Sequence, residues 1–206
     1  SIIGSAELLE NGLVKPEDQP RFLNRIHQEA DRLVALINDI LRLSQLDEGG
    51  ALPHEQVSVL ELAQEAARSL TAQAAAQAVH ISVTGTAGTV FGVRRLLYEI
   101  ARNLCENAVK YNVPGGSVTV EVAETDRDVA LLVRDTGIGI PEGDQSRVFE
   151  RFYRVDKSHS RAIGGTGLGL SIVKHAVAYH HGTLRLESQL GKGTVITVTL
   201  PKKPTE

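Results

Sequence analysis

The sequence predicts an α+β protein in which a helical hairpin precedes a mostly antiparallel sheet with helices on one face. Residues 1–48 place apolar side chains at alternating spacings of three and four, which is the period of amphipathic helices. From residue 57 onward, short segments with the two-residue period of strands alternate with helical segments. Because the strands largely come in adjacent pairs, we expect an α/β sandwich for this second part.

The hairpin of residues 1–48 is predicted to have two helices joined by a turn at residues 15–20. Its second helix carries a heptad rhythm with polar residues between the apolar positions. One hairpin buries such a stripe poorly, so we expect a homodimer through residues 1–48 that forms a four-helix bundle. The alternative is a monomeric hairpin that packs on its own second domain. The stripe comprises Ile2, Ala6, Leu9 and Leu13, then Leu23, Ile26, Ala30, Leu33, Ile37, Ile40 and Ser44.

Residues 49–56 are predicted to be a linker, because glycines and a proline interrupt the helical pattern between Asp47 and Pro53. Residues 57–206 would then form the second domain. Its expected helices are 60–77, 93–111 and 168–180. Its expected strands are 57–59, 80–84, 89–91, 117–123, 129–134, 183–188 and 194–200.

Composition narrows the class of protein. The chain has 206 residues, and 42% hydrophobic with 23% charged residues is ordinary for a globular fold. A net charge of −3 gives no basic face, which argues against nucleic acid as a partner. Cys105 is the only cysteine and is expected to be a buried thiol in a reducing compartment. No apolar run is long enough to span a bilayer, and the chain begins within a helical pattern without Met. We therefore expect a cytoplasmic fragment of a longer protein, attached to a membrane only through segments outside this chain.

The helix expected at 93–111 carries a polar face. Asn103, Asn107 and Lys110 fall at positions i, i+4 and i+7, and Glu106 lies beside them. Amide and carboxylate oxygens are ligands that suit Mg²⁺, and a lysine can meet a phosphate. The alternative is a solvated polar face. The group of four favours a site, because the opposite face of the helix is already apolar.

Two loops add groups that suit a nucleotide. Asp135 ends a predicted strand and is followed by Gly137 and Gly139, so its carboxylate can accept a hydrogen bond from an amine while a flat ring approaches the backbone. The alternative is an Asp-Gly turn without a ligand. Residues 137–165 form a long polar loop, in which residues 148–157 bring aromatic and cationic side chains together, as in a lid. The alternative is a small amphipathic helix pinned by Phe149 and Phe152, and the two interpretations are compatible.

The glycine-rich stretch at residues 164–169 precedes the last predicted helix. Four of its six residues are glycine, so its backbone can approach a ligand closely. A helix that begins directly after such a loop presents free N–H groups that suit phosphate. The stretch is not a Walker loop, because it lacks the Gly-Lys-Ser/Thr ending. We interpret it as a phosphate-binding loop.

Taken in order, these stretches resemble the N, G1, F and G2 boxes of the sensor histidine kinase ATP-binding domain. That domain belongs to the GHKL (Bergerat) superfamily with gyrase B, Hsp90 and MutL. Gly191 to Thr194 is similar to the last glycine segment of the family, and the hairpin looks like its dimerisation and histidine-phosphotransfer domain. The resemblance covers essentially the whole chain and implies ATP and Mg²⁺ as cofactors.

The resemblance implies a role for each matching residue. Asn107 would bind Mg²⁺ with help from Asn103. Glu106 would act as general base for an attacking imidazole, and Lys110 would contact phosphate. Tyr111 would lie beside the adenine, and Asp135, supported by Thr194, would accept from its amino group. Arg154, and less so Arg151, would contact phosphate. The pocket would be completed by Gly137, Gly139, Gly165, Thr166, Gly167, Leu168 and Gly169.

The chain departs from the family pattern at the phosphoacceptor. The family's His-Glu-x-x-x-Pro stretch is absent, and it would lie upstream of residue 1. His27 falls on the wrong helix and is expected to be a solvated side chain. His175, His180 and His181 are expected at the surface or at a strand edge, because no acidic or cysteine partner is close in sequence.

The resemblance predicts transfer of the γ-phosphoryl of ATP to that upstream histidine and then to an aspartate of a response regulator. Two other classes of function remain open. One is an ATPase or conformational clamp of the gyrase, Hsp90 or MutL kind. The other is a non-catalytic dimerisation or binding module.

Overall fold

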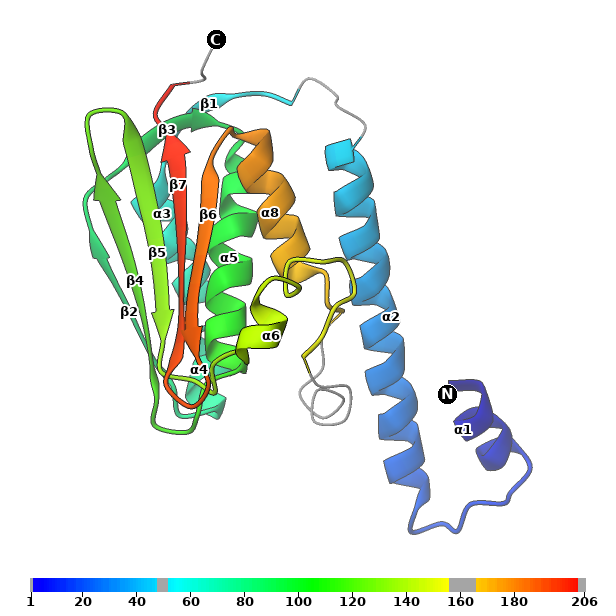
Figure 1. Ribbon diagram of the computed structural model, residues 1–206. Coiled ribbons are helices and arrows are strands. Elements are labelled where there is room, and N and C mark those ends of the chain that lie inside the picture. The colour runs from blue at the N-terminus through cyan, green and yellow to red at the C-terminus, as the bar shows by residue number, and fades with distance from the viewer. Residues whose placement is uncertain (1, 48–51, 156–165, 204–206) are drawn as a thin grey trace.

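The computed structural model describes residues 2–47, 52–155 and 166–203 of the chain (Figure 1). Its helices are α1 (Ile2–Glu10), α2 (Gln19–Asp47), α3 (Val59–Ser69), α4 (Thr71–Ala76), α5 (Arg94–Lys110), α6 (Glu142–Gln145) and α8 (Gly169–Tyr179). Its strands are β1 (Glu55–Ser58), β2 (His80–Gly85), β3 (Thr89–Gly92), β4 (Ser117–Glu124), β5 (Asp128–Asp135), β6 (Thr183–Gln189) and β7 (Gly193–Pro201).

Five strands form one sheet in the order β2-β4-β5-β7-β6. Only the β2–β4 pair is parallel, and the other three pairs are antiparallel. Helices α3, α5 and α8 cover one face of this sheet, while β1 and β3 form a separate antiparallel pair (Figure 1). This arrangement confirms the predicted α+β class.

The core lies between the sheet and its helical layer. Side chains that alternate along β4 and β5 point into it, as the two-residue period requires. Helix α5 contributes the longest buried face, whose fully or almost fully buried members include Leu96, Leu97, Ile100, Leu104 and Ala108. Because this apolar face holds α5 against the sheet, the opposite polar face of the same helix has a fixed direction.

The N-terminal hairpin consists of α1 and α2, which contact each other, and α2 also lies alongside α8 (Figure 1). Leu36 of α2 packs against the buried pair Leu168 and Ile172. Much of the apolar stripe stays exposed in a single chain, with Leu23 58% and Ile37 55% exposed. A face of this kind is typical of a helix that packs against a further helix.

The single helix expected at residues 60–77 is wrong, because the structure has two helices that meet at Leu70, where φ is −101° and ψ is 2°. Hydroxyl groups on both sides of the break bond the backbone. The Ser69 hydroxyl donates to the Ala66 carbonyl at 2.7 Å, and the Thr71 hydroxyl donates to the Arg68 carbonyl at 2.9 Å. Such local bonds compete with helix continuation.

The expectation of a surface or strand-edge position is also wrong for His180, which is buried at the end of α8. Its Nδ1 lies 2.7 Å from the Ala176 carbonyl, and its Nε2 accepts from the Val93 backbone N–H at 3.0 Å. The ring is therefore the Nδ1–H tautomer, since the Ala176 carbonyl can only accept. His180 joins the end of α8 to the start of α5.

Candidate functional site

Asp135 ends β5 and is held by the backbone on two sides. The Gly137 N–H donates to its Oδ1 at 2.8 Å, and the Thr194 N–H of β7 donates to the same oxygen at 3.1 Å. Burial raises the pKa of the Asp135 carboxyl, and the bonds from Gly137 and Thr194 act in the opposite direction. The carboxylate thus has a fixed orientation and is suited to accept from a further donor.

The two positions at 137 and 139 require glycine, because backbone atoms of neighbouring segments lie too close for a side chain. A Cβ on Gly137 would collide with the Tyr111 carbonyl oxygen, and one on Gly139 would collide with the Gln189 carbonyl oxygen. Gly139 also has a φ of +68°, which side chains disfavour. The Ile138 N–H donates to the Tyr111 carbonyl at 3.1 Å. The loop therefore rests on the end of α5 and on the β6–β7 turn.

The polar face of α5 meets the start of α8. A Cβ on Gly169 would lie 2.9 Å from Oδ1 of Asn103 and 3.8 Å from Nδ2 of Asn107. The glycine at the first position of α8 lets the helix start against both amides. The N–H groups at this end of α8 carry the positive end of the helix dipole, which favours an anion.

Glu106 and Lys110 extend this face towards Tyr111. Glu106 lies 3.8 Å from the guanidinium of Arg102, with both side chains more than a third exposed, so this ion pair is weak. The Lys110 ammonium lies 5.5 Å from the centre of the Tyr111 ring. Burial raises the pKa of Tyr111, nearby Arg154 lowers it and nearby Glu106 raises it. The Arg154 cation therefore lies within electrostatic reach of this end of α5.

A hydrogen bond and a close backbone contact connect Phe152 with Gly167, which lie on either side of residues 156–165 in the sequence. The Phe152 N–H donates to the Gly167 carbonyl at 3.0 Å, and a Cβ on Gly167 would lie 2.9 Å from the Phe152 carbonyl carbon. Gly167 has a φ of +75° and Phe152 has a φ of +65°, so both adopt the left-handed conformation. Leu168 is fully buried, and its N–H donates to the Thr166 hydroxyl at 3.2 Å. Gly167 thus lies directly against the predicted lid.

The two arginines of the predicted lid differ. Arg151 is exposed and its guanidinium lies 3.3 Å from Nε2 of His175 on α8, whereas Arg154 is half-buried near Tyr111. Gly165 and Lys157 fall outside the described residues. The site therefore brings together the end of β5, the polar face of α5, the lid segment and the start of α8.

The residues present fit a nucleotide with Mg²⁺. A half-buried carboxylate suits a base amine, and glycines at 167 and 169 leave room where a Cβ would meet the lid backbone and the Asn103 amide. In the part of the chain that the structure describes, no group of three or more His, Cys, Asp or Glu could hold a metal. Mg²⁺ held by amide oxygens would therefore need phosphate oxygens and waters as further ligands, which is how this ion commonly binds.

Sequence reasoning missed Glu99, which lies one helical turn before Asn103 and is buried. The Asn103 Nδ2 donates to the Glu99 backbone carbonyl at 2.8 Å and to the Glu99 carboxylate at 3.2 Å. The i−4 spacing to a polar site residue is a signal that the sequence does contain.

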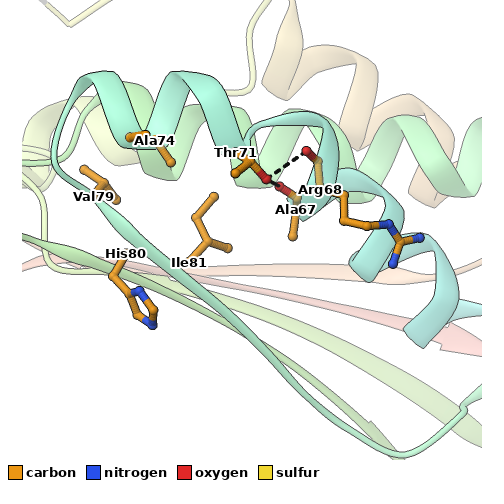
Figure 2. Close-up of a pocket in the computed structure, with 8 residues that line it drawn as sticks. Ala67, Arg68, Thr71, Ala74, Val79, His80 and Ile81 are labelled. Atoms are coloured by element: carbon orange, nitrogen blue, oxygen red, sulfur yellow. Dashed lines mark hydrogen bonds between the residues drawn. The ribbon is translucent and has the colours of Figure 1, made fainter.

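A hollow of about 350 Å³ lies between α3, α4 and the edge strand β2, and its lining includes none of the candidate site residues (Figure 2). Small apolar side chains form most of its lining, with Arg68 and His80 among the polar members (Figure 2). The Thr71 hydroxyl in its wall already donates to the Arg68 carbonyl. We assign no ligand to this hollow.

The fold and the site define an α/β sandwich that suits a nucleotide, with a helical hairpin at its N-terminal side. A sequence model of the histidine kinase-, DNA gyrase B- and HSP90-like ATPases matches residues 92–204, and the His Kinase A (phospho-acceptor) domain matches residues 1–49. The chain belongs to the two-component sensor histidine kinases.

Individual relatives agree with this membership. The chain is 39% identical to the sensor-like histidine kinase SenX3 of Mycolicibacterium smegmatis over 98% of its own length and 54% of the relative. It is 27% identical to full-length ShkA solved in complex with AMPPNP, with a TM-score of 0.76 over 99% of this chain and 43% of that one. The chain spans about half the length of the curated relatives it matches.

A third similarity concerns the fold alone. The histidine kinase ThkA, solved in complex with the response regulator protein TrrA, is 20% identical. Its TM-score is 0.75 over 98% of this chain and 57% of that one. Among the residues that the structure describes, no helix combines the length and the apolar character needed to cross a membrane.

Proposed function

We propose that this chain is the kinase portion of a sensor histidine kinase. It binds Mg·ATP and supports transfer of the γ-phosphoryl group to a histidine of the phosphoacceptor domain, and from there to an aspartate of a response regulator. The acceptor lies in a His-Glu-x-x-x-Pro stretch that is not among residues 1–206. The observation that carries the proposal is the Asp135 carboxylate, fixed by two backbone N–H groups beside a glycine loop.

Asp135 has the role of the base-recognising residue. An exocyclic amine is a donor, and the fixed carboxylate is an acceptor at the edge of a loop that glycines leave open. Gly137 lets the loop approach the backbone of Tyr111, whose ring is proposed as a flat apolar wall, and Gly139 lets it approach Gln189 on the other side. Thr194 keeps the carboxylate oriented through its backbone N–H.

The polyphosphate lies between α5 and α8 in this proposal. The N–H groups of Gly167 and Gly169 and the dipole of α8 receive the phosphate oxygens, while Gly165 and Thr166 complete the loop and buried Leu168 anchors it. Lys110 and Arg154 add positive charge, and Arg151 is the weaker contributor because its guanidinium is exposed beside His175. Mg²⁺, when bound by the Asn103 and Asn107 oxygens, neutralises developing phosphate charge.

Glu106 is the proposed general base. A neutral imidazole, with an ordinary pKa near 6.5, attacks the γ-phosphorus with one nitrogen and must lose the proton from the other. Glu106 is partly exposed and its partner Arg102 lies 3.8 Å away, so the carboxylate is free to rotate towards an incoming ring. Positioning and charge neutralisation supply most of the acceleration in such a transfer.

Residues 1–48 would form the dimerisation and phosphotransfer part, residues 49–56 the linker and residues 57–206 the catalytic part. The exposed apolar stripe of α2 supports a homodimer. A response-regulator receiver domain is the proposed partner, as it is for ThkA in its complex with TrrA. Because ATP is supplied in the cytosol, we assign this portion of the protein to the cytoplasm.

The test is transfer of radiolabel from γ-labelled Mg·ATP. This chain is incubated alone and with a longer chain that carries the upstream residues and Asn107→Ala. Label on the longer chain only, stable to base and lost in acid, supports the proposal once mixed dimers are demonstrated. Label on this chain alone assigns the acceptor to a histidine such as His27. Bound ATP without label on either chain favours an ATPase or clamp instead.

A further inference from the structure

We propose that Glu99 is a positioning residue that holds the Asn103 amide with its oxygen facing the metal. This inference rests on the proposed function, in which Asn103 helps to bind Mg²⁺. Glu99 lies one turn before Asn103 in α5 and is 8% exposed. A carboxylate that is buried to this extent is uncommon and generally has a defined polar role.

The hydrogen bonds of the Asn103 amide fix its orientation. Its Nδ2 donates to the Glu99 carbonyl at 2.8 Å and to the Glu99 carboxylate at 3.2 Å. Both groups on Glu99 are acceptors, so only the NH₂ end of the amide can face them. A flipped amide would place its oxygen against two other oxygens.

The opposite end of the amide faces the proposed site. Oδ1 of Asn103 lies 2.9 Å from the position that a Cβ of Gly169 would occupy, which is open because residue 169 is glycine. Asn107 approaches the same position with its amide nitrogen Nδ2, at 3.8 Å, so Asn103 is the residue that directs an oxygen there. Mg²⁺ binds oxygen and not amide nitrogen, so the orientation set by Glu99 determines whether Asn103 is a competent ligand.

The backbone carbonyl of residue 99 alone would leave this orientation less well defined. It can bond one hydrogen of the NH₂ group, whereas the carboxylate supplies a second, charged acceptor. Groups that orient a metal ligand in this way commonly change metal affinity tenfold or more when removed. The effect should therefore appear in the Mg²⁺ requirement and not in the contacts to the base.

The test measures ATP binding by calorimetry over a Mg²⁺ series and in EDTA, in Glu99→Leu and Glu99→Gln. Glu99→Leu should raise the Mg²⁺ midpoint about tenfold and leave metal-free ATP affinity unchanged. Glu99→Gln retains an acceptor and should remain within about twofold of the unmodified protein. An equal rise of the Mg²⁺ midpoint in both variants would assign the effect to the charge of Glu99 and would overturn its role in positioning Asn103. Glu124→Leu, which removes the ion-pair partner of Lys202 at the end of β4, is the control for loss of a glutamate outside the site.

A double-mutant cycle tests whether Glu99 acts through Asn103. In an Asn103→Ala background, Glu99→Leu should cause no further change in the Mg²⁺ midpoint. Additive losses would overturn the inference. If unmodified protein shows no Mg²⁺-dependent ATP binding, the proposed function fails, whereas normal Mg²⁺ dependence in a folded Glu99→Leu variant defeats this inference alone.

The metal-free, unmodified protein provides a measurement that does not depend on the folding of a variant. The two side-chain amide protons of Asn103, assigned by their loss in Asn103→Ala, should give separate nuclear magnetic resonance signals with slow solvent exchange. Signals that exchange as fast as those of the exposed Asn24 amide would overturn a fixed orientation.

Discussion

The backbone N–H of Thr194 donates a hydrogen bond to the carboxylate of Asp135 at 3.1 Å, which links the ends of β7 and β5. A second bond from Gly137 reaches the same oxygen. A carboxylate normally keeps its orientation inside a protein only where donors hold it. The base recognition that we propose at this position would therefore depend on the pairing of two strands that are distant in sequence.

Asp135→Asn should remove base recognition and preserve the fold. The asparagine oxygen can still accept from Gly137 and Thr194, but its NH₂ end opposes the amine of an adenine. Loss of one hydrogen bond to a charged acceptor costs about 2 kcal/mol, or roughly a thirtyfold weaker Kd for ATP. Calorimetric titration with ATP and ITP measures it, since ITP lacks the amine and should lose far less. Asp126→Asn, in the β4–β5 turn, is the control, and equal losses for ATP and ITP would contradict the assignment.

Alanine at Gly139 should destabilise the protein for two separable reasons. Gly139 has a positive φ and a Cβ there would collide with the Gln189 carbonyl. Gly115 has a positive φ with open space around it, and Gly143 has neither restriction. We expect about 1 kcal/mol of lost stability for Gly115→Ala, clearly more for Gly139→Ala, and little change for Gly143→Ala. Denaturant unfolding of the three variants gives this order, and equal losses at 139 and 115 would remove the close-contact argument.

The polar face of α5 could be predicted from the sequence, because the helical period alone places Asn103, Asn107 and Lys110 together. The bond between Asp135 and Thr194 could not. The two residues are 59 positions apart and meet because β5 pairs with β7, with Arg134 opposite Val195. Local periodicity identifies strands but not which strands are neighbours.

His180 was misplaced for a related reason. It was expected at the surface or at a strand edge because no acidic or cysteine partner is close in sequence, but the packing of α8 against α5 buries the ring beside Val93. The break at Leu70 was missed because the run of alanines indicates a helix, whereas the hydroxyls of Ser69 and Thr71 bond the backbone locally. A contact between residues distant in sequence decided the position of His180, whereas local bonds from side chains to the backbone decided the break at Leu70.

His180 should make the free energy of unfolding fall as the pH becomes mildly acidic. Burial lowers the pKa of His180 from its ordinary value of 6.5, and the ring must be neutral for Nε2 to accept from Val93. The unfolded state then binds the proton more readily than the folded state. The stabilisation that the neutral His180 ring contributes is fully present above pH 6.5 and is lost as the pH falls through the folded-state pKa.

The measurement is the free energy of unfolding between pH 8 and 5 for the unmodified protein and for His180→Gln. The unmodified protein should lose stability over this range by more than the variant does. His27→Gln, which changes an exposed histidine on α2, should retain the dependence of the unmodified protein. Identical pH profiles for the unmodified protein and His180→Gln would show that the ring of His180 is not the group responsible.

The apolar stripe of α2 should be required for dimer formation. Leu33 is 49% and Ile37 is 55% exposed in one chain, on the helix that the His Kinase A match covers. Burying such side chains contributes about 1.5–3 kcal/mol each, and a buried charge opposes association. The double change Leu33→Glu with Ile37→Glu should convert the protein to monomers in light scattering and sedimentation at micromolar concentration. Leu190→Glu changes a 63% exposed leucine in the β6–β7 turn and should leave the dimer intact.

Because ATP contacts only the second domain in the proposed arrangement, the monomeric variant should bind Mg·ATP normally while losing transfer of label in the mixed-chain assay. A variant that stays dimeric would place the interface elsewhere on the chain.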